Sequence, residues 1–528
     1  FGWYDTKISR FYSYCRVSTD DALEINEIVF TNKNGEPLKA SVVGANEWKT
    51  LSGGVYSEYV TVDNFSKENT AKGLVDEQAK FREYSPMSKK YNFTSEEASA
   101  INTALSIFSG DGSYADNKSG PLGVELIAIG LAAFGINTLG VRIVPYIFFL
   151  FTVGLMFALG RRIFKDSDAG LIMAGFYVLF GLGLSVGSIG SVTSIGVFFA
   201  LLSVYFMHMF FTGTEKYLFG KDNRVYGGKY DLFVPVIVSA ISFAFAFSVK
   251  LSTLFVLPAL IALLVLGVIN AVRVHRSNAA LVKFEDEKIR NDSQYKINVI
   301  GSSVVFVISY ALLTFLFTLL FYSVIGTNYV KFYSTSGLLP AVAADLKGGL
   351  FGTSGSRGAV LKWLIGGGST AILSSGEGAV SIGMNAVVQV LALVSIIATS
   401  IIICLGGLSK KASADMKLSA KKYAPLLIIL CAGWLFNWAT YALVKGAVVS
   451  DYLLASAFAC GFIALEYNLL KTGCELNGTA EKTFNVANIV LLVSLAVSVL
   501  LFGLGYVMFA GIEVGAVAAK ILYGWWLF

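Results

Sequence analysis

The chain has 528 residues, of which 55% are hydrophobic and only 14% are charged. Soluble domains carry about 25% charged residues, so this composition indicates an integral membrane protein and excludes a soluble enzyme. The formal net charge of +6 comes without a stripe of Lys and Arg interleaved with aromatic residues, so we expect no nucleic-acid partner.

The cysteines and histidines do not have the spacing of a metal site. The five cysteines form no Cys-x-x-Cys pair. The two histidines, His208 and His275, are too few for a His-based zinc site. We therefore predict no metal ligands, and we expect His208 to be buried or interfacial at the cytoplasmic end of a span.

Residues 1–75 are polar and contain alternating, strand-like segments. Ile8–Val17 is rich in aromatic and β-branched residues. The turn sequence NKNG (Asn32–Gly35) separates two further strand candidates, Leu23–Thr31 and Leu38–Val43. Short strands with turns between them predict a small antiparallel β-sandwich, which we expect outside the membrane.

A connector at 76–141 leads to a membrane domain at 142–508. The apolar part of the connector, Leu122–Gly135, is too short to span a bilayer and predicts an interfacial helix. The chain begins at Phe1 without Met or a signal-type segment, and we expect one more span to precede it. Ten apolar spans are predicted in the membrane domain, at about 142–164, 168–185, 191–211, 232–249, 251–272, 297–325, 385–408, 424–444, 451–470 and 485–508.

The distribution of basic residues predicts the orientation of the spans. Alternate loops are rich in Lys and Arg, and the first of them carries Arg161, Arg162 and Lys165. The positive-inside rule places these loops in the cytoplasm. The β-domain, the long loop 326–384 and the C-terminal tail 509–528 are then expected outside.

Glycine, proline, asparagine and arginine recur at characteristic positions in Ser119–Pro145, SGPLGVELIAIGLAAFGINTLGVRIVP. This frame resembles the juxtamembrane segment of the protein O-mannosyltransferase family, which reads roughly HPPLGK, an apolar stretch and GxxxFGxNxxGxRxxP. Ser119, Gly120 and Val124 stand where that family has His, Pro and Lys. The resemblance implies a C-type glycosyltransferase bundle of eleven spans, the number that ten spans and one preceding span give. The residues in register are Pro121, Leu122, Gly123, Phe134, Gly135, Asn137, Gly140, Arg142 and Pro145.

The resemblance also implies a candidate catalytic pair. Family members move a sugar from a polyprenyl phosphate to a protein hydroxyl, which needs a carboxylate base and a cation or divalent metal at the leaving phosphate. The stretch Leu74–Gln78 matches one upstream of the family's Asp-Glu pair and places that pair on Glu96 and Glu97. The Asp-to-Glu exchange moves the carboxylate, and a shift of about an ångström costs on the order of a hundredfold in rate. Both acids equally suit the first turn of a helix that Thr94 or Ser95 caps.

Alignment with the same family suggests roles for two further acids and two cations. Asp76-Glu77 forms a second acid pair but belongs to the connector. Arg142 lies where the family keeps an arginine near the membrane surface, so it is either a clamp for the donor phosphate or an interfacial anchor. Lys250 lies between two apolar spans in a stretch that resembles a family motif, and it either reaches the interface or contacts that phosphate.

The second outer loop keeps the apolar frame of the family but not its histidines. Trp363 and the stretch Val380–Asn385 lie in register, and Arg357 and Lys362 remain as cations that suit a lipid phosphate. Near Trp434–Lys445 the polar family motif is also replaced. Polar residues are thus missing at three separate sites.

Two functions remain open. One is a protein with reduced or lost catalysis and a structural or regulatory role in a membrane complex, and the substitutions at three sites favour it. The other is an active enzyme that moves a sugar from a polyprenyl phosphate to a Ser or Thr hydroxyl, with Glu96 or Glu97 as base. The expected partners are a polyprenyl-phosphate or other membrane lipid and protein subunits. No cofactor is certain, and a divalent cation belongs only to the active alternative.

Overall fold

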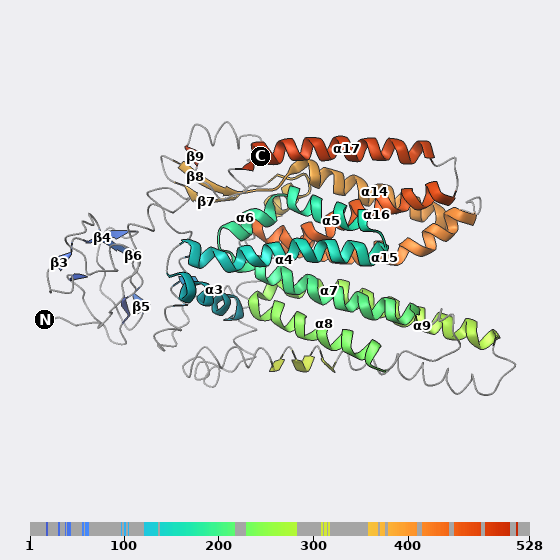
Figure 1. Ribbon diagram of the computed structural model, residues 1–528, viewed down its shortest axis with the longest axis horizontal. Coiled ribbons are helices and arrows are strands. Elements are labelled where there is room, and N and C mark those ends of the chain that lie inside the picture. The colour runs from blue at the N-terminus through green and yellow to red at the C-terminus, as the bar shows by residue number, and fades with distance from the viewer. Residues whose placement is uncertain are drawn as a thin grey trace.

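The helices of the chain lie side by side in one bundle (Figure 1). Their bounds are α3 Pro121–Phe134, α4 Thr138–Phe164, α5 Ser167–Leu179, α6 Leu182–Ser188, α7 Val192–Lys216, α8 Lys229–Val249, η2 Leu251–Val256, α9 Leu257–Leu281, α13 Arg357–Trp363, α14 Ala386–Leu408, α15 Ala414–Ala439, η4 Thr440–Ala442, η5 Val449–Tyr452, α16 Leu453–Leu476 and α17 Glu481–Leu504. The computed structural model describes six short strands between 17 and 62, residues 97, 100, 101 and 104, and the ranges 121–135, 138–216, 229–281, 308–309, 311–313, 315–316, 357–367, 370–374, 378–408, 414–442, 448–476, 481–506 and 514–515.

Several of these helices are long and apolar enough to cross a membrane, so the chain is a multi-pass membrane protein. By length and composition, seven helices in the described ranges qualify, or eight if α5 and α6 form one span. These two helices replace the straight span predicted at 168–185, and they meet at an angle of 58°. Gly181 at the break has a φ of 79°, which is the left-handed region that favours glycine. Most of the span predicted at 297–325 lies outside the described residues, so the count of ten remains a prediction.

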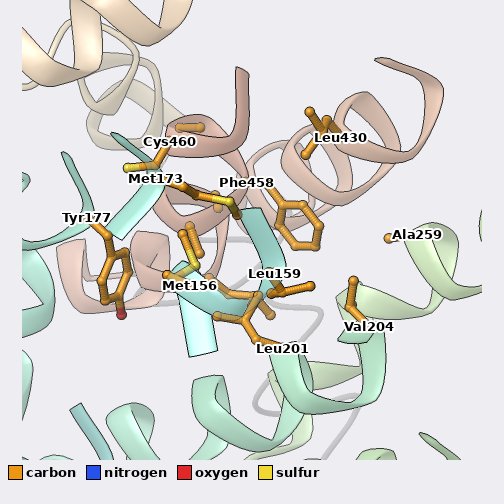
Figure 2. Close-up of a cluster of buried hydrophobic side chains, with 14 of the residues drawn as sticks. Met156, Leu159, Met173, Tyr177, Leu201, Val204, Ala259, Leu430, Phe458 and Cys460 are labelled. Atoms are coloured by element: carbon orange, nitrogen blue, oxygen red, sulfur yellow. The ribbon is translucent and has the colours of Figure 1, made fainter. Parts of the chain in front are cut away.

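The core of the bundle lies where α4, α5, α7, α9, α15 and α16 meet. Methionine, leucine and phenylalanine side chains from these helices interdigitate there with small residues that allow the helices to approach closely. Figure 2 shows Met156, Leu159, Met173, Tyr177, Leu201, Val204, Ala259, Leu430, Phe458 and Cys460 in this cluster.

The N-terminal region contains three antiparallel pairs of short strands. β1 (Val17–Ser18) pairs with β5 (Val55–Tyr56), and β4 (Ala40–Val43) pairs with β6 (Tyr59–Val62). β2 (Phe30–Thr31) pairs with β3 (Pro37–Leu38) on either side of the predicted NKNG turn. The packing of these pairs into a sandwich involves residues outside the described set, so the sandwich remains a prediction.

A second, three-stranded sheet joins two distant segments of the chain. β7 (Thr370–Ser374) and β8 (Gly378–Ile382) form a hairpin in the second long loop, and β9 (Val514–Gly515) from the C-terminal tail pairs with β8. β7, β8 and β9 therefore lie together at one end of the bundle, which is also the end at which the N-terminal strands lie (Figure 1). The placement of these segments outside the membrane remains a prediction.

The glycines of the family-like frame bring α3 and α4 into backbone contact. Gly135 ends α3 with a φ of 83°, and its N–H donates to the Leu131 carbonyl at 2.9 Å. A Cβ on Gly140 would lie 2.1 Å from the carbonyl oxygen of Gly135, and one on Gly130 would lie 2.4 Å from that of Gly140. The prediction of a short apolar helix over Leu122–Gly135 is confirmed, and these glycines fold it back onto α4.

Replacing Gly140 should therefore open this turn. We expect Gly140→Ala to destabilise the protein by about 1–3 kcal/mol or more, because overpacking against backbone cannot be relieved by a side-chain rotation. Gly154 is the matched control, since it lies in the same helix and a Cβ there meets nothing within 4 Å. Gly154→Ala should be neutral or stabilising by up to about 1 kcal/mol. Thermal unfolding of both variants in detergent measures the difference, and equal midpoints would contradict the proposed contact.

Candidate functional site

Glu97 and Arg142 form a buried ion pair. Arg142 donates from Nε to Glu97 Oε1 at 2.5 Å and from Nη2 to Oε2 at 3.2 Å, so both carboxylate oxygens accept from one guanidinium. The Glu97 side chain has no exposed surface, and Arg142 is 8% exposed. Arg142 lies in the first turns of α4, and α4 begins at the end of the bundle near the strands (Figure 1). Such a two-point pair fixes the orientation of both side chains.

The pair is held in place by a helical face and by a glycine turn. Glu97 shares helical backbone with Ala100, Ile101 and Ala104, which are all buried, and the spacing puts the four side chains on one face. Gly190, in the turn between α6 and α7, has a φ of 69°. A Cβ on Gly190 would lie 3.1 Å from both Glu97 Cγ and Oε1, so the turn covers the carboxylate directly.

Lys250 forms a second ion pair at the same end of the bundle. Its Nζ lies 2.7 Å from Asp451 Oδ1 and donates to Thr193 Oγ1 at 2.9 Å. Lys250 has extended backbone between α8 and η2, while Asp451 lies in η5 and also accepts from the Val448 N–H. The pair joins segments 201 residues apart in the sequence. Lys250 is thus paired with an acid, and its side chain is 19% exposed.

The start of α7 connects the two ion pairs. Gly190 contacts Glu97, and Thr193, three residues later, accepts from both Lys250 and Ser191. Gly123 of α3 packs over this point, because a Cβ there would lie 3.0 Å from Val192 and 3.1 Å from Val249. Gly123 therefore lies against the residues that precede Thr193 and Lys250 in sequence, and its lack of a side chain permits the close approach.

The frame residues of the second long loop hold α13 against the helix bundle. Trp363 of α13 is 1% exposed, and Trp438 of α15 donates to the Val360 carbonyl at 3.0 Å. Gln389 of α14 donates to the Leu364 carbonyl at 3.2 Å and accepts from Tyr452. These bonds fasten α13 onto the bundle, so the retained frame in this loop has a structural function.

The structure brings together three of the predicted site residues. Glu97, Arg142 and Lys250 gather around the start of α7. Lys362 is exposed on α13 and takes part in neither ion pair. Glu96 and the side chain of Arg357 lie outside the described residues, so their roles remain predictions.

Sequence analysis did not single out three acids of this structure. Asp451 lies at the predicted start of a span, where an acid beside apolar residues was the only signal. Glu466 of α16 accepts from Ser395 of α14 at 2.5 Å between two spans. Glu125 of α3 has a buried Oε1 with no hydrogen-bond partner, and burial raises the pKa of this carboxyl to about 7 from its usual value of 4.5. Within the described residues, no group of three or more His, Cys, Asp and Glu side chains could hold a metal ion.

The comparisons with known proteins support the fold. No family model and no curated protein matches this sequence. The S. cerevisiae protein O-mannosyltransferase Pmt1-Pmt2 complex bound to the sugar donor matches with a TM-score of 0.60 and 8% sequence identity, over 90% of this chain and 94% of that chain. ArnT from Cupriavidus metallidurans in the apo state matches with a TM-score of 0.28 and 11% identity, over 75% and 76% of the two chains. The predicted resemblance to protein O-mannosyltransferases is thus confirmed at the level of the fold.

Replacing one member of the Glu97–Arg142 pair should destabilise the protein more than the loss of the ion pair itself does. Arg142→Met removes the guanidinium that binds both oxygens of a buried carboxylate, so we expect about 3–5 kcal/mol of destabilisation, and Glu97→Leu should behave similarly. The double variant should be clearly more stable than the sum of the two losses predicts. Unfolding midpoints of the three variants in detergent complete the cycle, with Lys362→Met as an exposed control. Additive losses would show that the two side chains do not interact.

Glu125 should make stability depend on pH. Its raised pKa means that between about pH 4.5 and 7 the folded chain holds a proton that the unfolded chain has lost. This stabilisation is present below pH 4.5 and is lost as the pH rises through 7, so the unfolding midpoint should fall over that interval. Glu125→Gln should flatten this part of the profile and raise the midpoint at pH 8. An unchanged profile in Glu125→Gln would assign the slope to other groups.

Proposed function

We propose that this chain is a membrane protein related in fold to the polyprenyl-phosphate-sugar-dependent glycosyltransferases, with reduced or lost catalysis and a structural or regulatory role in a membrane complex. One observation carries the proposal. Glu97, Arg142 and Lys250, the predicted site residues at the start of α7, each have an oppositely charged partner within the chain.

The burial of Glu97 argues against its use as a general base. A base must come within hydrogen-bond distance of the hydroxyl proton that it removes. Both Glu97 oxygens accept from Arg142, the side chain has no exposed surface, and Gly190 covers it. An acceptor hydroxyl would reach this carboxylate only after the turn before α7 had moved away.

The charge balance argues against a phosphate site at the same place. Arg142 and Lys250 contribute two positive charges, and Glu97 and Asp451 contribute two negative charges. A lipid phosphate is attracted by a local excess of positive charge, and these four side chains provide none. Binding there would also break a buried ion pair, which is costly.

The second candidate is an active glycosyltransferase that moves a sugar from a polyprenyl phosphate to a Ser or Thr hydroxyl. It is favoured by the accessible part of Lys250, whose side chain is 19% exposed. In this alternative Glu96 or Glu97 acts as the base. Arg142, Lys250, Arg357 and Lys362 contact the donor phosphate, with a divalent cation where the chemistry needs one.

The organisation of the chain is part of the same proposal. It comprises a β-sandwich at 1–75, a connector at 76–141, a membrane domain of ten spans at 142–508 that includes the outer loop 326–384, and a tail at 509–528. The N-terminal domain and the C-terminus lie outside. The S. cerevisiae neighbour is a complex of two chains, and we extend a partner subunit and a polyprenyl-phosphate or other membrane lipid to this chain as proposed partners.

A transfer assay separates the two functions. The purified full chain is incubated with a polyprenyl-phosphate sugar and a Ser/Thr peptide, beside an active glycosyltransferase of this fold as positive control. We expect no transfer above background. Transfer by the full chain that disappears in Glu96→Gln or Glu97→Gln, but persists in the matched acid variant Glu77→Gln, would overturn the proposal and establish the enzyme.

A further inference from the structure

The opposite end of the bundle holds an arginine that reaches from α4 across to α7. Arg162 lies in the last turn of α4, and its guanidinium lies over the Tyr205 ring, 5.5 Å from the centroid. Its Nη2 donates to Thr212 Oγ1 at 3.3 Å. Tyr205, His208 and Thr212 are spaced three and four residues apart on α7, so they share the face that Arg162 meets. Within the described part of the chain, the guanidinium therefore has no acid partner.

Two polar atoms of this cluster have no hydrogen-bond partner. Arg162 Nε and His208 Nδ1 are both buried and have no hydrogen-bond partner, and His208 as a whole is only 2% exposed. Buried polar groups are paired in the great majority of cases, so two unused atoms on facing helices need an explanation. They come from different helices: Arg162 of α4 donates to Thr212, and His208 lies one turn before Thr212 on α7, so a shared ligand is the simplest explanation.

The cluster also has an unbalanced positive charge. Arg162 takes part in no salt bridge among the described residues, and the exposed Arg161 and Lys165 lie on either side of it in the sequence. The nearest acids in sequence, Asp166 and Asp168, are bound by Lys471 of α16 at 2.7 Å and 3.3 Å. Among the side chains that the structure describes, the charge at the end of α4 is therefore positive.

The depth of the cluster matches the headgroup region of a bilayer. The span on α4 that carries Arg162 ends at Phe164, two residues after it. Phospholipid phosphates lie at this level, and basic pockets between helix ends bind anionic headgroups. A ligand that contributes oxygen acceptors and negative charge is the complement of what Arg162 and His208 leave unused.

We propose that Arg162 and His208 bind the phosphodiester of an anionic phospholipid at the basic end of the α4–α7 pair. The phosphate reaches the accessible edge of the guanidinium, and rotation about the last bonds of Arg162 turns Nε toward it. His208 donates from Nδ1 to a second phosphate oxygen. Thr212 positions the arginine, because its hydroxyl donates to the His208 and Met209 carbonyls and accepts from Arg162 Nη2. Arg161 and Lys165 disfavour the cationic headgroup of a zwitterionic lipid. This site is independent of transfer activity.

The test compares two neighbouring arginines. Native mass spectrometry of the full chain in detergent, titrated with phosphatidylglycerol, gives the affinity of single lipid molecules. We expect Arg162→Ala to weaken binding about tenfold, which is about 1.4 kcal/mol, and Arg161→Ala, with the same change in charge, to have much less effect. Phosphatidylcholine should bind more weakly than phosphatidylglycerol. Equal losses in the two variants, or equal binding of the two lipids, would overturn the proposal, because both indicate non-specific attraction.

Two further arms complete the test. Arg162→Lys keeps the charge but loses the forked donors, so it should bind with intermediate affinity, and it serves if the alanine variant does not fold. Unchanged binding in Arg162→Lys would show that only the positive charge matters, and this result would contradict the proposal. Inorganic phosphate is titrated in a thermal-shift assay of the same protein. Stabilisation by phosphate alone that Arg162→Ala abolishes would assign the site to a free anion and overturn the lipid assignment.

Discussion

The buried pair between Glu97 and Arg142 is the interaction on which the end of the bundle near the sheets depends. It joins the segment before the membrane to the first described span, and the turn at Gly190 closes over it. That turn begins α7, whose Thr193 accepts from Lys250 and whose Ser194 donates to the Pro145 carbonyl. Lys250 in turn binds Asp451 at the start of α16. Buried charges are stable only when they are paired, so the positions of α4, α7, α8 and α16 at this end are coupled through these contacts.

The family-like frame and the family's chemistry are separable because they obey different physical requirements. Gly130, Gly135 and Gly140 are needed for backbone contact between α3 and α4, and Gly123 is needed for contact with Val192 and Val249. Any chain that keeps this packing must keep small residues at these positions, whatever its function. The polar positions have no such requirement, since Val124, which replaces a lysine, is simply buried at 3% exposure. A frame of this kind identifies the fold and leaves the function to the site.

Packing could be predicted from the sequence, whereas polar partners could not. Apolar length predicted most of the helices, including the short Leu122–Gly135 helix. Alternating residues and a turn sequence predicted the antiparallel strands around Asn32–Gly35. Both kinds of signal depend on residues near one another in the chain. The ion pairs depend on residues 45 and 201 positions apart, which only the packed bundle brings together. The break at Gly181 was also not predicted. Two apolar segments joined by a left-handed glycine have the same composition as one unbroken span. The predicted roles of Arg142 as a clamp or surface anchor overlooked a third possibility, a buried partner.

The two ends of the bundle differ in how their charges are balanced, and this difference bears on where an anion can bind. At the end near the sheets, Arg142 and Lys250 each have an acid within 3 Å. Glu97 and Asp451 limit anion binding there, because they neutralise the two cations. Adding a cation elsewhere on the surface would therefore not create a site. At the other end Arg162 has no acid partner among the described side chains, and Asp166 and Asp168, which are close to it in sequence, bind Lys471 instead. A positive charge in this position is stable only beside a negative headgroup or water, so the same arrangement that neutralises one end of the protein directs its free charge toward the lipid at the other.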